Sequence, residues 1–168
     1  GVASKKDLSY RETGPVLRPV DPAIQPGTGG WGLVFGAQAF KKIYTHAYIY
    51  ADGTYLTNPK EMNGTESPYA DVPEITFNDI GYMIDSIPDH YSVRAGLSHE
   101  IPRIKGLSGI FGVRMDGVKA KDLFGGSDGY RLPGYSISIE PGASFAHGKS
   151  FFSVNIPVTV RGHGSKTL

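Results

Sequence analysis

Six charged residues stand within segments whose other polar positions hold mainly serine and glycine. They are Arg94, Glu100, Arg114, Asp116, Glu140 and Arg161. Such charges among small residues can line a water-filled passage and select solutes by charge. They can equally pair with one another and fill a narrow interior as a buried ion-pair network. The sequence leaves both interpretations open, and neither needs a cofactor.

Residue types that catalyse reactions lack the spacing that catalysis needs. Serine and histidine are present, but a Gly-x-Ser-x-Gly elbow is not. The minor alternative is a hydrolase at the rim of a barrel, built from acids and a histidine. Its candidate residues are Asp52, Asp89, His90, Asp122 and Asp128. We predict that the protein is not an enzyme.

Metal-binding patterns are weak as well. Cysteine is absent and the five histidines show no paired ligand spacing, so Cys-based zinc and iron–sulfur sites are excluded. Asp122 and Asp128 flank a glycine-rich turn and are weak candidates for calcium ligands. The preferred interpretation is a turn whose aspartates accept backbone hydrogen bonds. We therefore expect no metal and no cofactor.

The composition favours many short strands joined by turns. Among 168 residues there are 23 glycines and 12 prolines, and aromatic residues make up 11%. A formal net charge of +1 provides no basic field for nucleic acid. There is no apolar run of about 20 residues, so no membrane-spanning helix is predicted.

Six segments alternate apolar and polar residues with period two, which predicts strands. They cover residues 31–39, 44–55, 91–100, 107–116, 135–145 and 152–161. Each is close to the roughly 9–11 residues with which a tilted strand crosses a bilayer. Pro141 and Pro157 predict a bulge or an interrupted ladder, because proline lacks the backbone donor.

The connections between these segments are alternately short and long. Short turns are expected near Lys41-Lys42 and at residues 102–105 and 146–149, and long connections at 57–90 and 118–134. This asymmetry is typical of an outer-membrane barrel with long extracellular loops. By the same parity, residues 1–30 form an extracellular loop or linker and 162–168 begin a further loop. Within the first long connection, Asp71 to Ile84 have helical spacing.

The alternative fold is a soluble antiparallel sandwich, which also alternates apolar and polar residues. Two features favour the barrel. All ten lysines lie outside the six predicted strands, whereas a solvent-facing sheet normally carries lysine. Aromatic residues also stand near strand ends, as in the girdles of membrane barrels. We therefore predict an all-β, antiparallel, up-and-down transmembrane barrel.

Several motifs support this prediction through a resemblance. They are Asp21 to Trp31, Asn58 to Glu61, Ile87 to Leu97, Asp122 to Tyr135 and Glu140 to Gly142. Together they resemble a family of bacterial outer-membrane β-barrel proteins described as transporter or porin-like, over roughly residues 20–160. The resemblance implies a barrel in the outer membrane of a Gram-negative bacterium, but no particular solute.

The chain departs from a complete member of that family at both ends. Residues 1–10 lack the apolar run of a signal peptide, and the chain does not end in a strand with a terminal aromatic. Six strands would also leave two open edges, which lipid cannot satisfy. We expect the chain to be a C-terminal-side portion of a larger barrel.

Three functions remain open at this stage. The first is a porin- or transporter-like barrel that passes small solutes, with membrane lipid as its surroundings. The second is a barrel that anchors or scaffolds a surface assembly and binds other protein subunits through its extracellular loops. The third is a soluble secreted β-sandwich that serves as a binding module.

Overall fold

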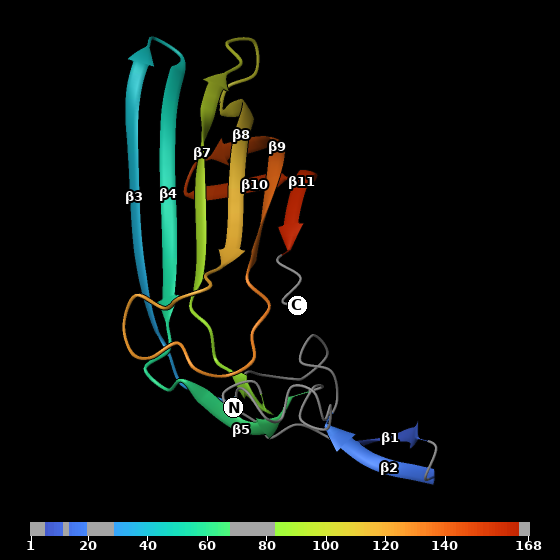
Figure 1. Cartoon of the computed structure of the whole chain (residues 1–168). Helices are drawn as coiled ribbons and strands as arrows, with labels where there is room; N and C mark the ends of the chain where they lie inside the picture. Colours follow the sequence, from blue (N-terminus) through green and yellow to red (C-terminus); the bar gives the residue numbers. More distant parts are fainter. Residues whose placement is uncertain (1–5, 12–13, 20–28, 68–82, 165–168) are drawn as a thin grey trace. The chain divides into compact units, whose positions relative to one another are not determined.

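A computed structural model describes residues 6–11, 14–19, 29–67 and 83–164 of the chain (Figure 1). Its regular structure in these ranges is β-strand, and the strands pair antiparallel, which confirms the predicted all-β antiparallel class. Nowhere in these ranges is there a helix long and apolar enough to cross a membrane. Most of the helix expected between Asp71 and Ile84 lies outside the described residues, and Ile84 itself belongs to a strand.

The chain divides into two compact units. The sheet unit comprises Val34–Leu56, His90–Val118 and Pro133–Leu168, and the loop unit comprises Gly1–Leu33, Thr57–Asp89 and Lys119–Leu132. The strands of the main sheet are β3 (Leu33–Tyr44), β4 (Ala47–Thr57), β7 (His90–Glu100), β8 (Leu107–Val118), β9 (Gly134–His147), β10 (Ser150–Asn155) and β11 (Val158–Gly164).

The main sheet is a meander. Its order is β10-β9-β8-β7-β4-β3, and β11 also pairs with β9. The connections from β4 to β7 and from β8 to β9 pass through the loop unit, and β9 pairs with both β10 and β11. The sheet ends at β3 on one side and at β10 and β11 on the other, so the described residues form an open sheet and not a closed barrel.

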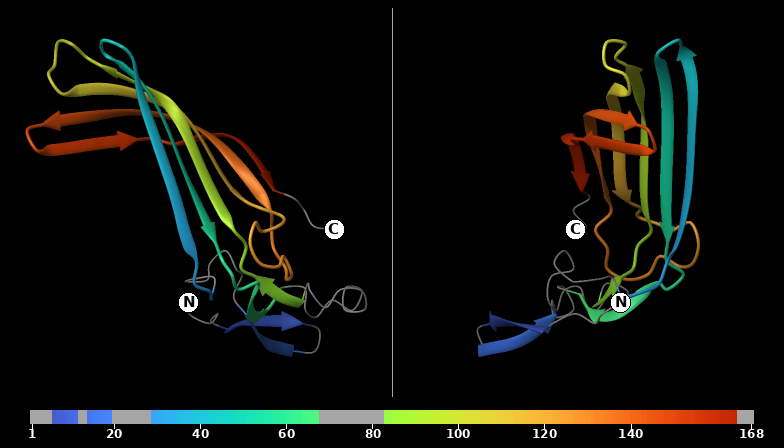
Figure 2. Two further views of the ribbon diagram at one scale, coloured as in Figure 1. Left: turned by 90° about the vertical axis from the view of Figure 1, so that its left-hand side faces the viewer. Right: turned by 180° about the vertical axis from the view of Figure 1, so that it is seen from behind.

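The sixth predicted strand is interrupted at its proline, as the sequence indicated. β10 ends at Asn155 and β11 begins at Val158, and both pair with β9. Because Pro157 has no backbone donor, the ladder breaks there, while the Ile156 amide donates to the Pro141 carbonyl at 2.9 Å. β9 runs unbroken through Pro141 and bends along its length (Figure 2).

The first predicted turn is misplaced. Lys41 and Lys42 belong to β3, and the chain reverses at Thr45 and His46 instead. The alternation stops at Ala39, but β3 continues to Tyr44 because pairing with β4 depends on backbone groups. Two adjacent lysines are tolerated in an edge strand, since their long side chains can reach water.

The two faces of the sheet have inverted burial. Register aligns Ala51, Ala95, Val113, Ile139 and Val158 across five strands as one apolar row. Large side chains on this apolar face are exposed, including Phe111 at 55% and Val113 at 46%. The other, polar face buries Ser138 and Glu140, which are 4% and 2% exposed. The described residues of the sheet unit form no second sheet over the apolar face, whereas the sandwich alternative would require one.

The loop unit contains strands where the sequence suggested loops. β1 (Lys6–Arg11) pairs with β2 (Gly14–Pro19) inside the predicted 1–30 loop, and β5 (Met62–Glu66) pairs with β6 (Ile84–Ser86) inside the predicted 57–90 loop. Because these segments are rich in proline and glycine, the sequence did not indicate their short strand pairs. β11 likewise continues to Gly164, beyond the predicted strand end, and residues 165–168 are not described.

Candidate functional site

The most concentrated charges of the sheet unit lie side by side on its polar face. Register places Asp52 opposite Arg94, Arg94 opposite Arg114, and Gly112 opposite Glu140. Asp116 stands two residues beyond Arg114 and therefore on the same face. We call these five residues the charge cluster. Because β4, β7, β8 and β9 each supply at least one member, the cluster exists only when the four strands are in register.

Each arginine has an aspartate of its own. Arg94 Nε donates to Asp52 Oδ2 at 2.9 Å, and Arg114 Nη2 donates to Asp116 Oδ1 at 2.8 Å, with Arg114 Nε 2.7 Å from Asp116 Oδ2. These bonds carry charge on both partners and are stronger than neutral ones. They fix the direction in which each guanidinium points.

Glu140 holds the two arginines together. Its Oε2 lies 3.7 Å from Arg94 Nη1 and its Oε1 lies 3.6 Å from Arg114 Nη1. Like charges opposite each other in neighbouring strands destabilise a sheet, so a carboxylate between them offsets the repulsion. The Glu140 side chain is 3% exposed, whereas those of Arg94 and Arg114 are 34% and 40% exposed.

The Tyr50 side chain lies over two glycines, Gly96 and Gly112. It stands opposite Gly96, which stands opposite Gly112, and a Cβ at either glycine would come within 2.5 Å of the Tyr50 hydroxyl. Only glycine leaves this space open. The Arg94 guanidinium lies 5.8 Å from the centre of the Tyr50 ring. The tyrosine therefore covers the glycines and packs beside the charge cluster.

The six predicted site residues divide into three groups. The structure brings Arg94, Arg114, Asp116 and Glu140 together in the charge cluster. Glu100 is elsewhere, with its Oε2 3.0 Å from Nδ1 of His46, and both side chains are 45% exposed.

Arg161 lies on the opposite face of the sheet from the one predicted. A register shift between Thr159 and Arg161 pairs Arg161 with Ile137, a residue of the apolar face. The extra residue in β11 reverses the alternation beyond it, which no count along the sequence could foresee. Arg161 is exposed there and does not join the charge cluster.

Asp52 and Tyr50 are members of the site that sequence reasoning did not select. Asp52 was considered only as a rim acid of a hydrolase. Both stand on the polar side of the second predicted strand, so the alternation carried the signal. What was missing was the register between β4 and β7, which are 32 residues apart in the chain.

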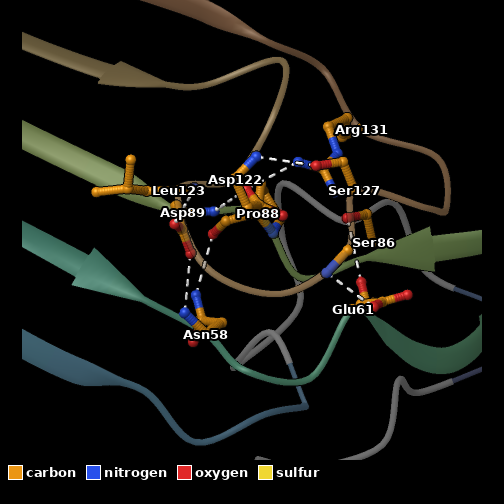
Figure 3. Close-up of polar contacts among 10 residues, drawn as sticks. Asn58, Glu61, Ser86, Pro88, Asp89, Asp122, Leu123, Ser127 and Arg131 are labelled. Atoms are coloured by element: carbon orange, nitrogen blue, oxygen red, sulfur yellow. Dashed lines mark hydrogen bonds and ion pairs between the residues drawn. The ribbon is translucent and has the colours of Figure 1, made fainter.

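The weak calcium candidates have different surroundings. Asp122 Oδ1 accepts from Arg131 Nη1 at 2.8 Å and from the Asp89 amide at 2.9 Å, and its side chain is 1% exposed (Figure 3). Asp128 is exposed. Asp122 therefore accepts a backbone bond, as the preferred interpretation held. Among the described residues, no group of three or more His, Asp or Glu could hold a metal ion.

Asp89 is the centre of the loop unit, and it was not selected as a structural residue. It is fully buried, and its two carboxylate oxygens accept from the amides of Asn58 and Leu123 at 2.9 and 3.1 Å. Glu61 makes a similar link through Oε1, which accepts from the Gly126 amide at 2.8 Å (Figure 3). Carboxylates thus tie together three segments that are distant in sequence.

The two sites have different chemistry. Four of the five charges in the charge cluster are about one-third exposed, on an otherwise serine- and glycine-rich surface. The carboxylates of the loop unit accept hydrogen bonds from backbone amides, which hold its segments together. Comparison of the chain with known proteins gives no matching family model, no matching curated protein and no matching solved structure.

Proposed function

We propose that the sheet unit is part of a porin- or transporter-like β-barrel in a Gram-negative outer membrane, and that it passes small solutes. The observation that carries the proposal is the inverted burial of the sheet. Phe111 and Val113 are about half exposed on one face, whereas Glu140 is buried on the other. In water this exposes apolar area at a cost of about 25 cal/mol per Å². Against hydrocarbon the cost disappears.

The topology supports the same proposal. An up-and-down antiparallel meander with strands of 11 to 14 residues in β4, β7, β8 and β9 is the pattern of a membrane barrel. The edges at β3 and at β10 and β11 would then pair with further strands, because lipid cannot satisfy free backbone groups. In this arrangement the polar face lines the interior.

The charge cluster would then act on passing ions. Two guanidiniums face three carboxylates, so its formal charge is 2 − 3 = −1. Four of its five side chains are 32–40% exposed, which leaves them open to water. The interior wall would therefore weakly favour cations over anions.

Planar bilayers with the full-length protein test this directly. We expect Arg114→Gln, which takes the cluster from −1 to −2, to raise the cation-to-anion permeability ratio. Asp52→Asn, which takes it to 0, should lower that ratio. Lys60→Gln, at an exposed position of the loop unit, is the control and should leave the ratio unchanged. Equal ratios in all four proteins would remove the charge cluster from the conducting path.

A second candidate is a barrel that serves as anchor or scaffold for a surface assembly. The order of the loop unit favours it. The buried Asp89 carboxylate accepts from the Leu123 amide and so holds the loop that presents Leu123 and Phe124, whose exposed fractions are 59% and 58%. Apolar side chains on an ordered loop suit docking of another protein subunit. Membrane insertion without any conductance would favour this role over transport.

The third candidate, a soluble binding module, can be distinguished from both barrel functions by whether the protein needs detergent to stay dispersed. A membrane barrel stays folded in detergent micelles and aggregates when the detergent is removed. A soluble module stays monomeric in plain buffer. Size-exclusion chromatography after detergent removal distinguishes the two outcomes, and a monodisperse detergent-free monomer would overturn the barrel proposal.

A further inference from the structure

The two ends of the sheet unit have different residues. The turns of β3–β4 and β7–β8 lie at one end (Figure 1), and register places the β9–β10 turn at the same end of the ladder. Five exposed cations gather at this end, which we call the basic rim: Lys41, Lys42, Arg103, Lys105 and Lys149. Within the described parts of the chain, none of the five takes part in an ion pair.

The opposite end carries aromatic side chains in its outermost register positions. Register aligns Tyr55 with Tyr91 and Tyr135 with His163, and both pairs lie on the apolar face. Gly117 separates them in the same row. The last two register positions of every strand at this end hold no Lys, Arg, Asp or Glu. We call this the tyrosine row.

The distance between the two ends fits a membrane. Ala47 is the first residue of β4, Tyr55 is its residue in the tyrosine row, and eight residue steps separate them. At roughly 3.3 Å per residue this is about 26 Å along the strand. A tilt of about 40° reduces it to about 20 Å, close to the roughly 25 Å apolar band of outer-membrane barrels.

We propose that the basic rim binds the phosphate groups of anionic lipids in the leaflet at the short-turn end, while the tyrosine row lies at the opposite interface. The inference rests on the proposed function. Charge complementarity supports it, because among the described residues at this end five cations stand beside one carboxylate, Glu100, which is paired with His46. Lysine and arginine stems can cover apolar surface while their charged groups reach a headgroup.

The test compares insertion of the full chain into two kinds of vesicle. One contains phosphatidylcholine only, and the other contains phosphatidylcholine with an equal amount of phosphatidylglycerol of the same chain length. Protease protection measures the inserted fraction over time. Lys105→Gln/Lys149→Gln changes two cations of the basic rim, and Lys60→Gln/Lys121→Gln, which are exposed residues of the loop unit, is the matched control.

We expect phosphatidylglycerol to speed insertion of the natural chain at least fivefold at low salt. The rim variant should lose most of that advantage, and the loop-unit variant should keep it. Added salt should reduce the advantage of the natural chain, because it screens exposed charges. Rates in pure phosphatidylcholine should be the same for all three proteins.

Two other outcomes separate the inference from the proposed function. The lipid-binding role of the basic rim would be wrong if insertion showed no preference for phosphatidylglycerol, or if both variants lost that preference equally. Neither result would contradict the membrane barrel. A chain that stays accessible to protease in both kinds of vesicle would overturn the membrane barrel, and the lipid site with it.

Discussion

The sheet unit and the loop unit both bury carboxylates, but they satisfy them in opposite ways. In the sheet, Glu140 lies between Arg94 and Arg114. In the loop unit, Asp89 accepts from the backbone amides of Asn58 and Leu123. The cause is the backbone. Strand amides are already paired in the ladder, so a carboxylate there needs a cationic side chain, whereas irregular segments leave amides that an acid can bind.

This difference implies that loss of a buried carboxylate destabilises the two units in different ways. Loss of a loop-unit acid should release segments of chain, because it leaves backbone donors unpaired. Loss of a sheet acid should leave the strands in place but bring two cations into conflict. Two substitutions test this contrast, and a third tests the packing beside the charge cluster.

Asp89→Ala should have the largest effect. It leaves the buried Asn58 amide and the part-buried Leu123 amide without an acceptor. Bonds to a charged group are worth roughly 1.5–3 kcal/mol each, so we expect a loss of about 3–5 kcal/mol in local stability. Hydrogen exchange should accelerate at Asn58 and Leu123, while exchange in β8 stays slow. Equal acceleration in β8 would show that the two units unfold together, and would break the comparison.

Glu140→Ala should have an intermediate effect. It leaves Arg94 opposite Arg114 with no carboxylate between them. Removing one partner of a fully buried pair costs roughly 3–5 kcal/mol. Because both arginines are more than one-third exposed, water screens part of their repulsion, and we expect about 2–3 kcal/mol.

Urea unfolding in detergent measures the effect of Glu140→Ala. Removing one of the two facing cations as well, in Glu140→Ala/Arg94→Gln, should recover part of the loss because the repulsion between the guanidiniums is gone. If the double variant is less stable by the full sum of the single losses, the two residues are not coupled and the cluster is not a unit.

Gly112→Ala should have the smallest of the three effects, about 1–2 kcal/mol, because its Cβ would overlap the Tyr50 hydroxyl. Gly109→Ala is the matched control in the same strand, since a Cβ there has no atom within 4 Å, and it should change stability by less than about 0.5 kcal/mol. Tyr50→Phe should reduce the cost at Gly112 because it removes the overlapping oxygen. An equal loss of stability in Gly112→Ala and Gly109→Ala would show that Tyr50 does not require glycine at position 112.

Much of the strand pattern could be predicted from local alternation. Residues 107–116 show the alternation of β8, and Pro157 indicates the break between β10 and β11. These features depend only on neighbours along the chain. A strand with one apolar face must alternate, and a proline cannot donate to a ladder.

Other features were decided only in the tertiary structure. The hairpin at Thr45 and His46 sets the end of β3, and the pairing of β4 with β7 brings Asp52 to Arg94. The bulge before Arg161 turns that residue to the other face. Alternation specifies which residues share a face of one strand, but the partner strand and its register depend on contacts between distant segments. One residue of shift exchanges the faces, so a site built across four strands has no local signature in the sequence.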